Sequence, residues 1–167
     1  MPALAQRRAA LIDQLAYLGD EVEALRQIVK VVPEPLLSGR PLPDDHSIKE
    51  LYGWIAQQDA DVHRPRLERL LAEDTPRVDA VDQAAMLARR NWNAVSIDAI
   101  LTAVQDERAR FVQFVAAIPE AEWTRTLDLE ATRYDVYAYL YAVIQANTAD
   151  LRMLGYRLHE SLSEARR

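Results

Sequence analysis

Four polar residues that could take part in chemistry interrupt otherwise apolar stripes of this sequence. Gln58 and Asp59 fall in the middle of one stripe, Arg108 in a second and Asn147 in a third. A buried charge is costly unless it is paired, so Asp59 and Arg108 are expected to pair, with Gln58 and Asn147 completing the hydrogen bonds. Such a layer either fixes the helix register or lines a pocket open to water. Alternatively, Arg108 extends outward into solvent.

Tyrosines are concentrated close to this layer in the sequence. Four of the seven fall within eight residues, namely Tyr134, Tyr137, Tyr139 and Tyr141. Tyr137 and Tyr141 are one helical turn apart, so their hydroxyl groups could line a pocket beside Asn147. Packing at the edge of the core is the simpler interpretation of the pair.

The histidines do not form a recognisable metal site. His46, His63 and His159 are too far apart for a helical pair at i, i+4. Asp59 and His63 do have that spacing, but a zinc site needs three or four ligands, so a solvated helix face explains them better. There is no cysteine, which excludes thiolate ligands and thiol nucleophiles. We therefore expect no metal and no cofactor.

The composition is that of an acidic globular chain. Its 167 residues fit a single domain spanning residues 1–167, and its four glycines favour helix. The net charge of −6 gives no general attraction for phosphate backbones or anionic lipids, so we expect no nucleic-acid or membrane partner. No apolar run approaches the roughly 20 residues that span a bilayer. Residues 1–10 lack the apolar region of a signal peptide, so we expect a cytoplasmic protein.

Four long amphipathic patterns would position the polar residues. Apolar residues recur at helical spacing over residues 4–32, beginning at Leu4, and again over residues 48–71, 97–118 and 136–158. No strand pattern competes with them. Each stripe needs a partner to cover it, so the chain is expected to form an all-α four-helix bundle.

Local signals indicate where three of these helices begin. Ser47 and Glu50 have the spacing of a capping box, in which each side chain bonds the other's free amide. Ser96 is a suitable cap for the third helix. Thr132 and Asp135 repeat the spacing more weakly before the fourth.

Prolines indicate the breaks and the connections. Pro65 predicts a kink or break near residues 63–64, and Pro119 ends the third helix. The proline-rich segment 33–46 is expected to be a stiff loop. The weakly patterned link 73–95 has room for a short helix over residues 81–88.

The run that follows the loop resembles a motif of the DinB-like superfamily, the DNA-damage-inducible four-helix bundles. That family often has Trp-Ser-hydrophobic-Lys-Asp/Glu-Leu-x-x-His at this place. The chain keeps four residues of this motif, namely Ser47, Lys49, Glu50 and Leu51. It differs at two positions. His46 replaces the tryptophan, and Trp54 replaces the metal-binding histidine. The resemblance covers most of the chain.

In the family, two further histidines on the last helix complete a divalent metal site. The best register places these positions at Val143 and Asn147, and a slip of one residue toward Ala146 yields no histidine either. The resemblance therefore implies the fold, a pocket at the bundle centre and homodimerisation, without a metal-dependent activity. We hypothesise that Arg108 supplies the positive charge in place of a dication.

Three functional hypotheses follow. The first is a metal-free DinB-like bundle whose central polar pocket binds a small molecule or only fixes the fold. The second is a metal- or thiol-dependent transferase or hydrolase with a degenerate or atypical site, in which Asp59 acts as base and Arg108 or a tyrosine stabilises an anion. The third is a stress protein linked to nucleic acid, although the net charge argues against direct DNA contact. The pocket candidates are Trp54, Gln58, Asp59, Arg108, Tyr137, Tyr141 and Asn147.

Overall fold

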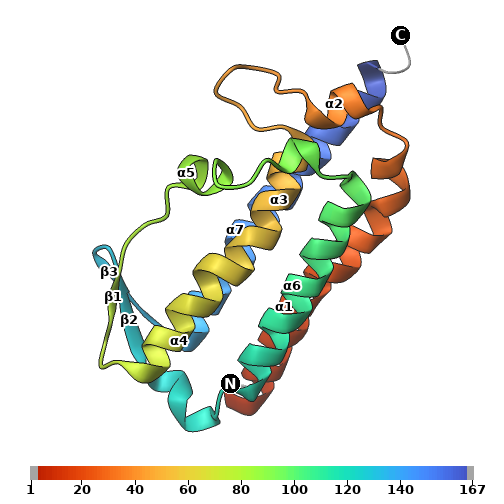
Figure 1. The fold of residues 1–167 in the computed structure, drawn as a ribbon. Coiled ribbons are helices and arrows are strands. Elements are labelled where there is room, and N and C mark those ends of the chain that lie inside the picture. The colour runs from red at the N-terminus through yellow and green to blue at the C-terminus, as the bar shows by residue number, and fades with distance from the viewer. Residues whose placement is uncertain (1–3, 165–167) are drawn as a thin grey trace.

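Four long helical rods dominate the computed structural model (Figure 1). It describes residues 4–164 and the side chains of residues 5–163, so the side chain of Leu4 lies outside the described part. The second rod consists of two α-helices joined by a π-helical segment, η1 (Asp59–His63). The α-helices of the four rods are α1 (Leu4–Lys30), α3 (Ile48–Gln58), α4 (Arg64–Ala72), α6 (Ile97–Ala117) and α7 (Val136–Glu164).

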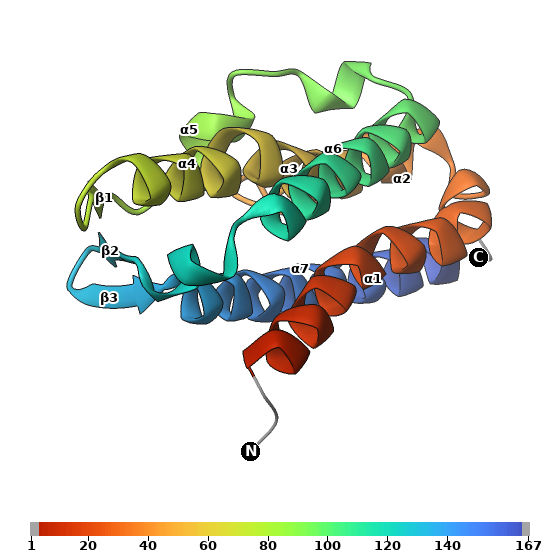
Figure 2. The same ribbon diagram turned by 90° about the horizontal axis from the view of Figure 1, so that it is seen from below.

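The rods lie in two layers. One layer contains α3, α4 and α6, and the other contains α1 and α7 (Figure 2). The colour gradient in Figure 1 shows that α1 and α7 run in one direction, whereas α3–α4 and α6 run in the other. The expected four-helix bundle is confirmed. Within residues 4–164, no helix is both long and apolar enough to cross a membrane.

Two of the three predicted helix starts are confirmed. Ser47 Oγ accepts the Glu50 amide at 3.1 Å, and a Glu50 carboxylate oxygen accepts the Ser47 amide at 2.8 Å. Ser96 Oγ accepts the Ala99 amide at 3.3 Å. The prediction for the fourth helix is wrong, because Thr132 belongs to a strand. Asp135 itself caps α7, accepting the Ala138 amide at 2.7 Å.

A small sheet at one end of the bundle was not expected from the sequence. Strand β1 (Arg77–Val78) pairs in parallel with β2 (Thr126–Leu129), which pairs antiparallel with β3 (Thr132–Asp135). Strands of two to four residues are too short to show an alternating pattern. The turn between β2 and β3 places Glu130 at a φ of 52°.

The connecting segments contain more structure than predicted. Segment 33–46 is not simply a loop, because it contains α2 (Glu34–Ser38). Pro35 fits in the first turn of α2, where the backbone amide has no hydrogen-bond partner within the helix. The link 73–95 contains α5 (Gln83–Leu87), within the predicted range, and a 3₁₀ turn, η2 (Trp92–Ala94). A further 3₁₀ turn, η3 (Glu120–Thr124), follows α6.

The predicted break before Pro65 takes the form of η1. The Arg64 amide bonds the carbonyl of Asp59, five residues earlier, which is the π-helical pattern. Pro65 has no amide hydrogen, and its ring would crowd the carbonyl of Asp61 in a regular α-helix. The wider turn relieves that crowding and lets the rod continue into α4.

The apolar core is divided into two clusters along the bundle. The first includes Leu18, Tyr52, Ile55, Val104 and Leu154. The second includes Leu15, Leu70, Phe111, Leu140 and Val143. On α6 and α7, the positions between the two clusters are occupied by Arg108 and Asn147, both buried. The polar layer therefore separates the two halves of the core.

Candidate functional site

Arg108 lies at the centre of the buried layer and pairs with Asp59 and Asn147. Its side chain is 2% exposed. Nη2 donates to Asp59 Oδ1 at 3.1 Å and to Asn147 Oδ1 at 2.7 Å, and Nη1 donates to the carbonyl of Leu15 at 3.5 Å. Arg108 Nε lies 2.7 Å from Asp59 Oδ2, an ion-pair contact without the alignment of a hydrogen bond. The expected pairing is confirmed, and the solvent-exposed alternative for Arg108 is wrong.

Burial and charge pairing act in opposite directions on this ion pair. Burial raises the pKa of Asp59 to about 6, although Arg108 pulls it down. Burial lowers the pKa of Arg108, and the charge of Asp59 opposes that shift. The attraction between the two charges therefore offsets part of the cost of burying them.

Gln58 belongs to a second buried network rather than to the Arg108 pair. Its Nε2 donates to Asp150 Oδ2 at 3.1 Å, and its Oε1 lies 3.2 Å from His63 Nε2. His63 Nδ1 lies 2.9 Å from the hydroxyl of Tyr139. With Gln58 in this orientation, His63 donates from Nε2 and accepts the Tyr139 proton at Nδ1. None of His63, Tyr139 and Asp150 was predicted to belong to the layer.

The expectation that Asp59 and His63 lie on a solvated face is wrong. Both are buried, because positions four apart share one face of the rod and this face packs against α6 and α7: Asp59 pairs with Arg108, and the His63 ring lies beside Phe111 and Tyr139. Burial, followed by repulsion from Arg108, lowers the pKa of His63 to about 3. His63 is therefore neutral at pH 7, as the hydrogen bonds at its two ring nitrogens require.

The predicted pair of tyrosines does not join the layer. Tyr141 is 50% exposed, and Tyr137 is partly buried with the Arg7 guanidinium 5.8 Å from its ring centre. Tyr139 is the residue that reaches the networks. The α7 stripe could have indicated it, because Tyr139 is three residues after Val136 and four before Val143, both of which are buried.

Trp54 is also displaced from the layer. It is partly buried and packs against the first core cluster. Figure 1 shows that α3 and α7 run in opposite directions, and Gln58 bonds Asp150 on α7. Trp54 is four residues before Gln58, so it lies about one turn closer than Gln58 to the C-terminal end of α7. Val143 belongs to the second cluster. The three positions at which the resembling family has histidines are therefore not assembled at one point.

The residues present do not fit a divalent metal. Within residues 4–164, no three His, Cys, Asp or Glu side chains are grouped closely enough to hold an ion. Asp59 faces the Arg108 guanidinium, and both nitrogens of His63 are engaged. A dication at this place would have to displace a buried cation from its carboxylate.

A surface recess of about 230 Å³ adjoins the layer. Asp59 and Ala60 of η1 lie at its inner wall, and Arg64, Glu107 and Arg110 are among the other residues that line it. Asp59 is only 1% exposed. The recess thus approaches the ion pair without opening it to bulk water.

Comparison with known proteins supports the fold and leaves the activity open. No family model and no curated protein matches the sequence. Among solved structures, the chain is similar to YfiT from Bacillus subtilis, with a TM-score of 0.70 and 14% identity over 91% of this chain and 87% of that one. YfiT is described as "a probable metal-dependent hydrolase with an unusual four-helix bundle topology". The similarity shows that the two chains share this four-helix-bundle fold.

Proposed function

We propose that this protein is a ligand-binding helical bundle that does not use a central metal ion. The observation that carries the proposal is the Arg108 guanidinium, which is buried between Asp59 and Asn147 at the bundle centre. A fixed positive charge in a low-dielectric layer repels a dication and occupies the carboxylate that would bind it. In this reading the central layer fixes the fold, and the ligand binds elsewhere.

Elemental analysis of the purified chain without a histidine tag tests this proposal. We expect far less than one equivalent of zinc, nickel, manganese or iron per chain, and no change in melting temperature on adding these ions. The informative variants are Asp59→Asn and, as a matched control, Asp61→Asn, because Asp61 is the exposed acid of the same π-helical segment. A stoichiometric metal that is lost only in Asp59→Asn would overturn the proposal.

A second candidate function is hydrolysis or group transfer at the recess beside Asp59. A carboxylate with a pKa near 6 is suited to act as a general base, and Arg64 and Arg110 at the recess could stabilise an anion. The likeness to YfiT, described as a probable metal-dependent hydrolase, favours the same class. The burial of Asp59 and its pairing with Arg108 place this candidate second.

A screen of ester, amide and thiol-transfer substrates distinguishes the two candidates. If Asp59 is a base, turnover disappears in Asp59→Asn and persists in Glu68→Gln, which changes another carboxylate of the recess. Activity that is independent of Asp59 would contradict this second candidate.

We also propose that two copies associate through the face formed by α1 and α7. A groove of about 640 Å³ runs between these helices and is lined by Tyr17, Leu25 and Leu151, with Glu21 and Arg152 providing opposite charges. In a two-fold arrangement, Glu21 of one protomer would face the partner's Arg152. This self-complementary charge pattern favours a second copy of the chain as the occupant.

Sedimentation velocity tests the association. We expect a dimer for the native chain and a monomer for Tyr17→Asp, which places a charge in the groove. Leu42→Asp is the control, because Leu42 is similarly exposed but lies in segment 33–46. A monomeric native chain would contradict the proposed dimer.

A further inference from the structure

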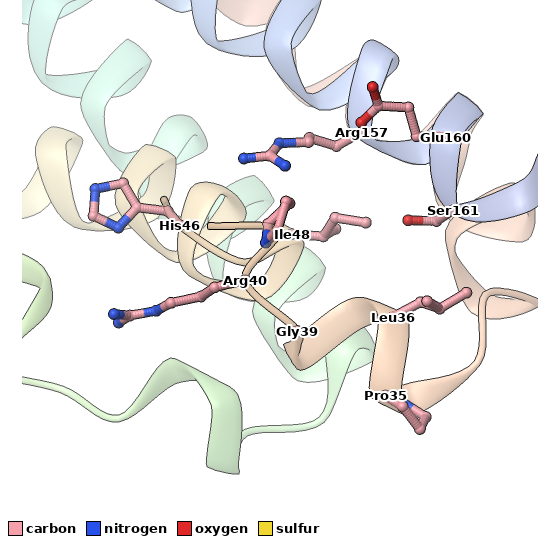
Figure 3. Close-up of a pocket in the computed structure, with 10 residues that line it drawn as sticks. Pro35, Leu36, Gly39, Arg40, His46, Ile48, Arg157, Glu160 and Ser161 are labelled. Carbon is pink, nitrogen blue, oxygen red and sulfur yellow. The ribbon is translucent and has the colours of Figure 1, made fainter. Parts of the chain in front are cut away.

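A pocket of about 210 Å³ lies at the opposite end of the bundle from the sheet. Segment 33–46 and the first turn of α3 form one wall, and the last turns of α7 form the other (Figure 3). The pocket is smaller than the roughly 300–1,000 Å³ typical of sites for drug-sized ligands. Its occupant would have to be a small molecule.

One end of this pocket is rich in hydrogen-bond donors. In Figure 3, the side chains of Arg40, His46 and Arg157 extend toward the same side. The Nδ1 atom of His46 is buried and has no hydrogen-bond partner within residues 4–164. Since an unpaired buried polar atom is costly, this nitrogen is open to one further hydrogen bond, from a ligand or from water.

The two arginines are held in place and retain unused donors. Arg157, with a side chain 14% exposed, contacts Asp45 Oδ2 through Nη2 at 3.1 Å. Arg40 contacts the two oxygens of Glu50 through Nε and Nη2, at 3.0 and 2.5 Å. A guanidinium has five N–H groups, so each keeps others for a ligand, and the existing pairs reduce the entropy lost on binding.

The other end of the pocket is apolar. Ile48, Leu36 and Pro35 line it, and Figure 3 shows the Ile48 and Leu36 side chains extending away from the arginines. The Ser161 hydroxyl and the Glu160 carboxylate come from α7. Two guanidinium groups face three carboxylates here, on Asp45, Glu50 and Glu160, so a ligand carboxylate would be held by hydrogen bonds and not by net charge, and a second negative charge would be unfavourable.

We propose that this pocket binds a small monocarboxylate with a short apolar chain. The carboxylate lies among Arg157, His46 and Arg40, where it can accept bidentate hydrogen bonds, and the chain lies against Ile48 and Leu36. This inference rests on the proposed function as a ligand-binding bundle, and it names the ligand class and the site.

Calorimetric titration of the full chain tests the site, with hexanoate as the probe. We expect hexanoate to bind, and hexanol and inorganic phosphate to bind at least about tenfold more weakly, since each lacks one half of the match. Arg157→Gln should weaken hexanoate by about tenfold or more. Its control is Arg89→Gln, the same change at an exposed arginine in the link 73–95.

A second variant shows whether a loss of binding comes from the pocket itself or from unfolding of the chain. Ser161→Glu places a carboxylate in the pocket at a half-buried position and should abolish hexanoate binding while the melting curve stays cooperative. Absence of hexanoate binding, equal binding by phosphate, or equal affinities of Arg157→Gln and Arg89→Gln would overturn the site. NMR titration with hexanoate locates the binding site. If the backbone amide chemical shifts change around Asp59 and not around Ser161, the proposed pocket is wrong but the ligand-binding function stands. A stoichiometric bound metal ion would instead contradict the proposed function.

Discussion

Among individual residues, Arg108 has the most partners at the bundle centre. It joins η1, α6 and α7 through Asp59 and Asn147, and it reaches α1 through the carbonyl of Leu15. A buried ion pair often adds little net stability relative to apolar residues, but removing one partner leaves an uncompensated charge. Its contribution is therefore best measured by comparing single and paired substitutions.

Arg108→Ala is expected to lower the free energy of unfolding by about 3–5 kcal/mol, because Asp59 would remain buried without its cation. Arg108→Met combined with Asp59→Leu should recover most of that loss. Urea denaturation of Arg108→Ala, of Arg108→Met and Asp59→Leu separately, and of their combination measures both effects.

The matched control is Arg110→Ala, two residues along the same helix. Arg110 pairs with Glu107 on the surface, and its side chain is 58% exposed, so we expect a change below about 1 kcal/mol. Strictly additive effects of the Arg108 and Asp59 substitutions would show that the buried pair is not an interacting unit.

His63 makes stability depend on pH. Its pKa falls from 6.5 in the unfolded chain to about 3 in the folded chain, so the unfolded chain binds the extra proton first. The stabilisation is complete above pH 6.5 and is lost as the pH falls toward 3. Asp59, with its raised pKa, acts in the opposite sense, losing stabilisation as the pH rises from 3.8 to about 6.

Comparison with His63→Gln separates these two contributions. The native chain's advantage in unfolding free energy over His63→Gln should fall as the pH is lowered from 6.5 to 3. The fall is up to about 4 kcal/mol, which is enough to reverse the sign of the difference. Denaturation at several pH values measures this difference. His159→Gln, the same change at an exposed position, is the matched control. A pH-independent difference for His63→Gln would contradict its burial as a neutral ring.

Among the elements, the link 73–95 packs against α3 through Trp92 and is also bonded to it through Met86 and Asn93. The Trp92 indole lies against Gly53, and its Nε1 donates to Gln57 Oε1 at 3.4 Å. The Arg90 guanidinium covers the ring at 4.0 Å from its centre. A β-carbon at Gly53 would lie 2.6 Å from Trp92 Cε2, which no side-chain contact tolerates. Glycine is therefore required inside this helix despite its low helix propensity.

Gly53→Ala is expected to destabilise the protein by about 1–3 kcal/mol, because the indole must move out of its packed position. Gly155→Ala is the control on α7, where an added β-carbon meets nothing within 4 Å. That substitution should stabilise by about 0.4–1 kcal/mol. Thermal unfolding of both variants measures the contrast, and equal stabilisation would contradict the contact with Trp92.

Helix starts can be predicted from the sequence where the signal is local. The bond between Ser47 and Glu50 spans three residues, and so does the one from Ser96 to Ala99. The sheet cannot be predicted in this way, because Arg77 pairs with Asp128, about fifty positions away. Thr132 was misassigned as a cap for a different reason: β2 and β3 form a local hairpin of four-residue strands, which are too short to show an alternating pattern.

For the whole molecule, the bundle and the composition of its central layer can be predicted from periodicity. Arg108, Asp59 and Asn147 each interrupt a stripe, and all three are buried together. The partners of Gln58 and His63 come from α7, and such contacts between distant segments leave no periodic signature in the sequence. The pocket near Arg157 depends on how segment 33–46 folds back on α7, which is likewise a tertiary property.

The polar layer also has a consequence for how the molecule opens. Apolar packing is interrupted between Leu15 and Leu18 on α1 and between Val104 and Phe111 on α6. Cooperative opening follows continuous apolar packing, so we expect two units with different opening free energies. Native-state amide hydrogen exchange should separate amides around the sheet from those around Tyr52, with the boundary at Arg108. A single exchange free energy throughout would mean that the buried ion pair couples the two halves as strongly as apolar packing does.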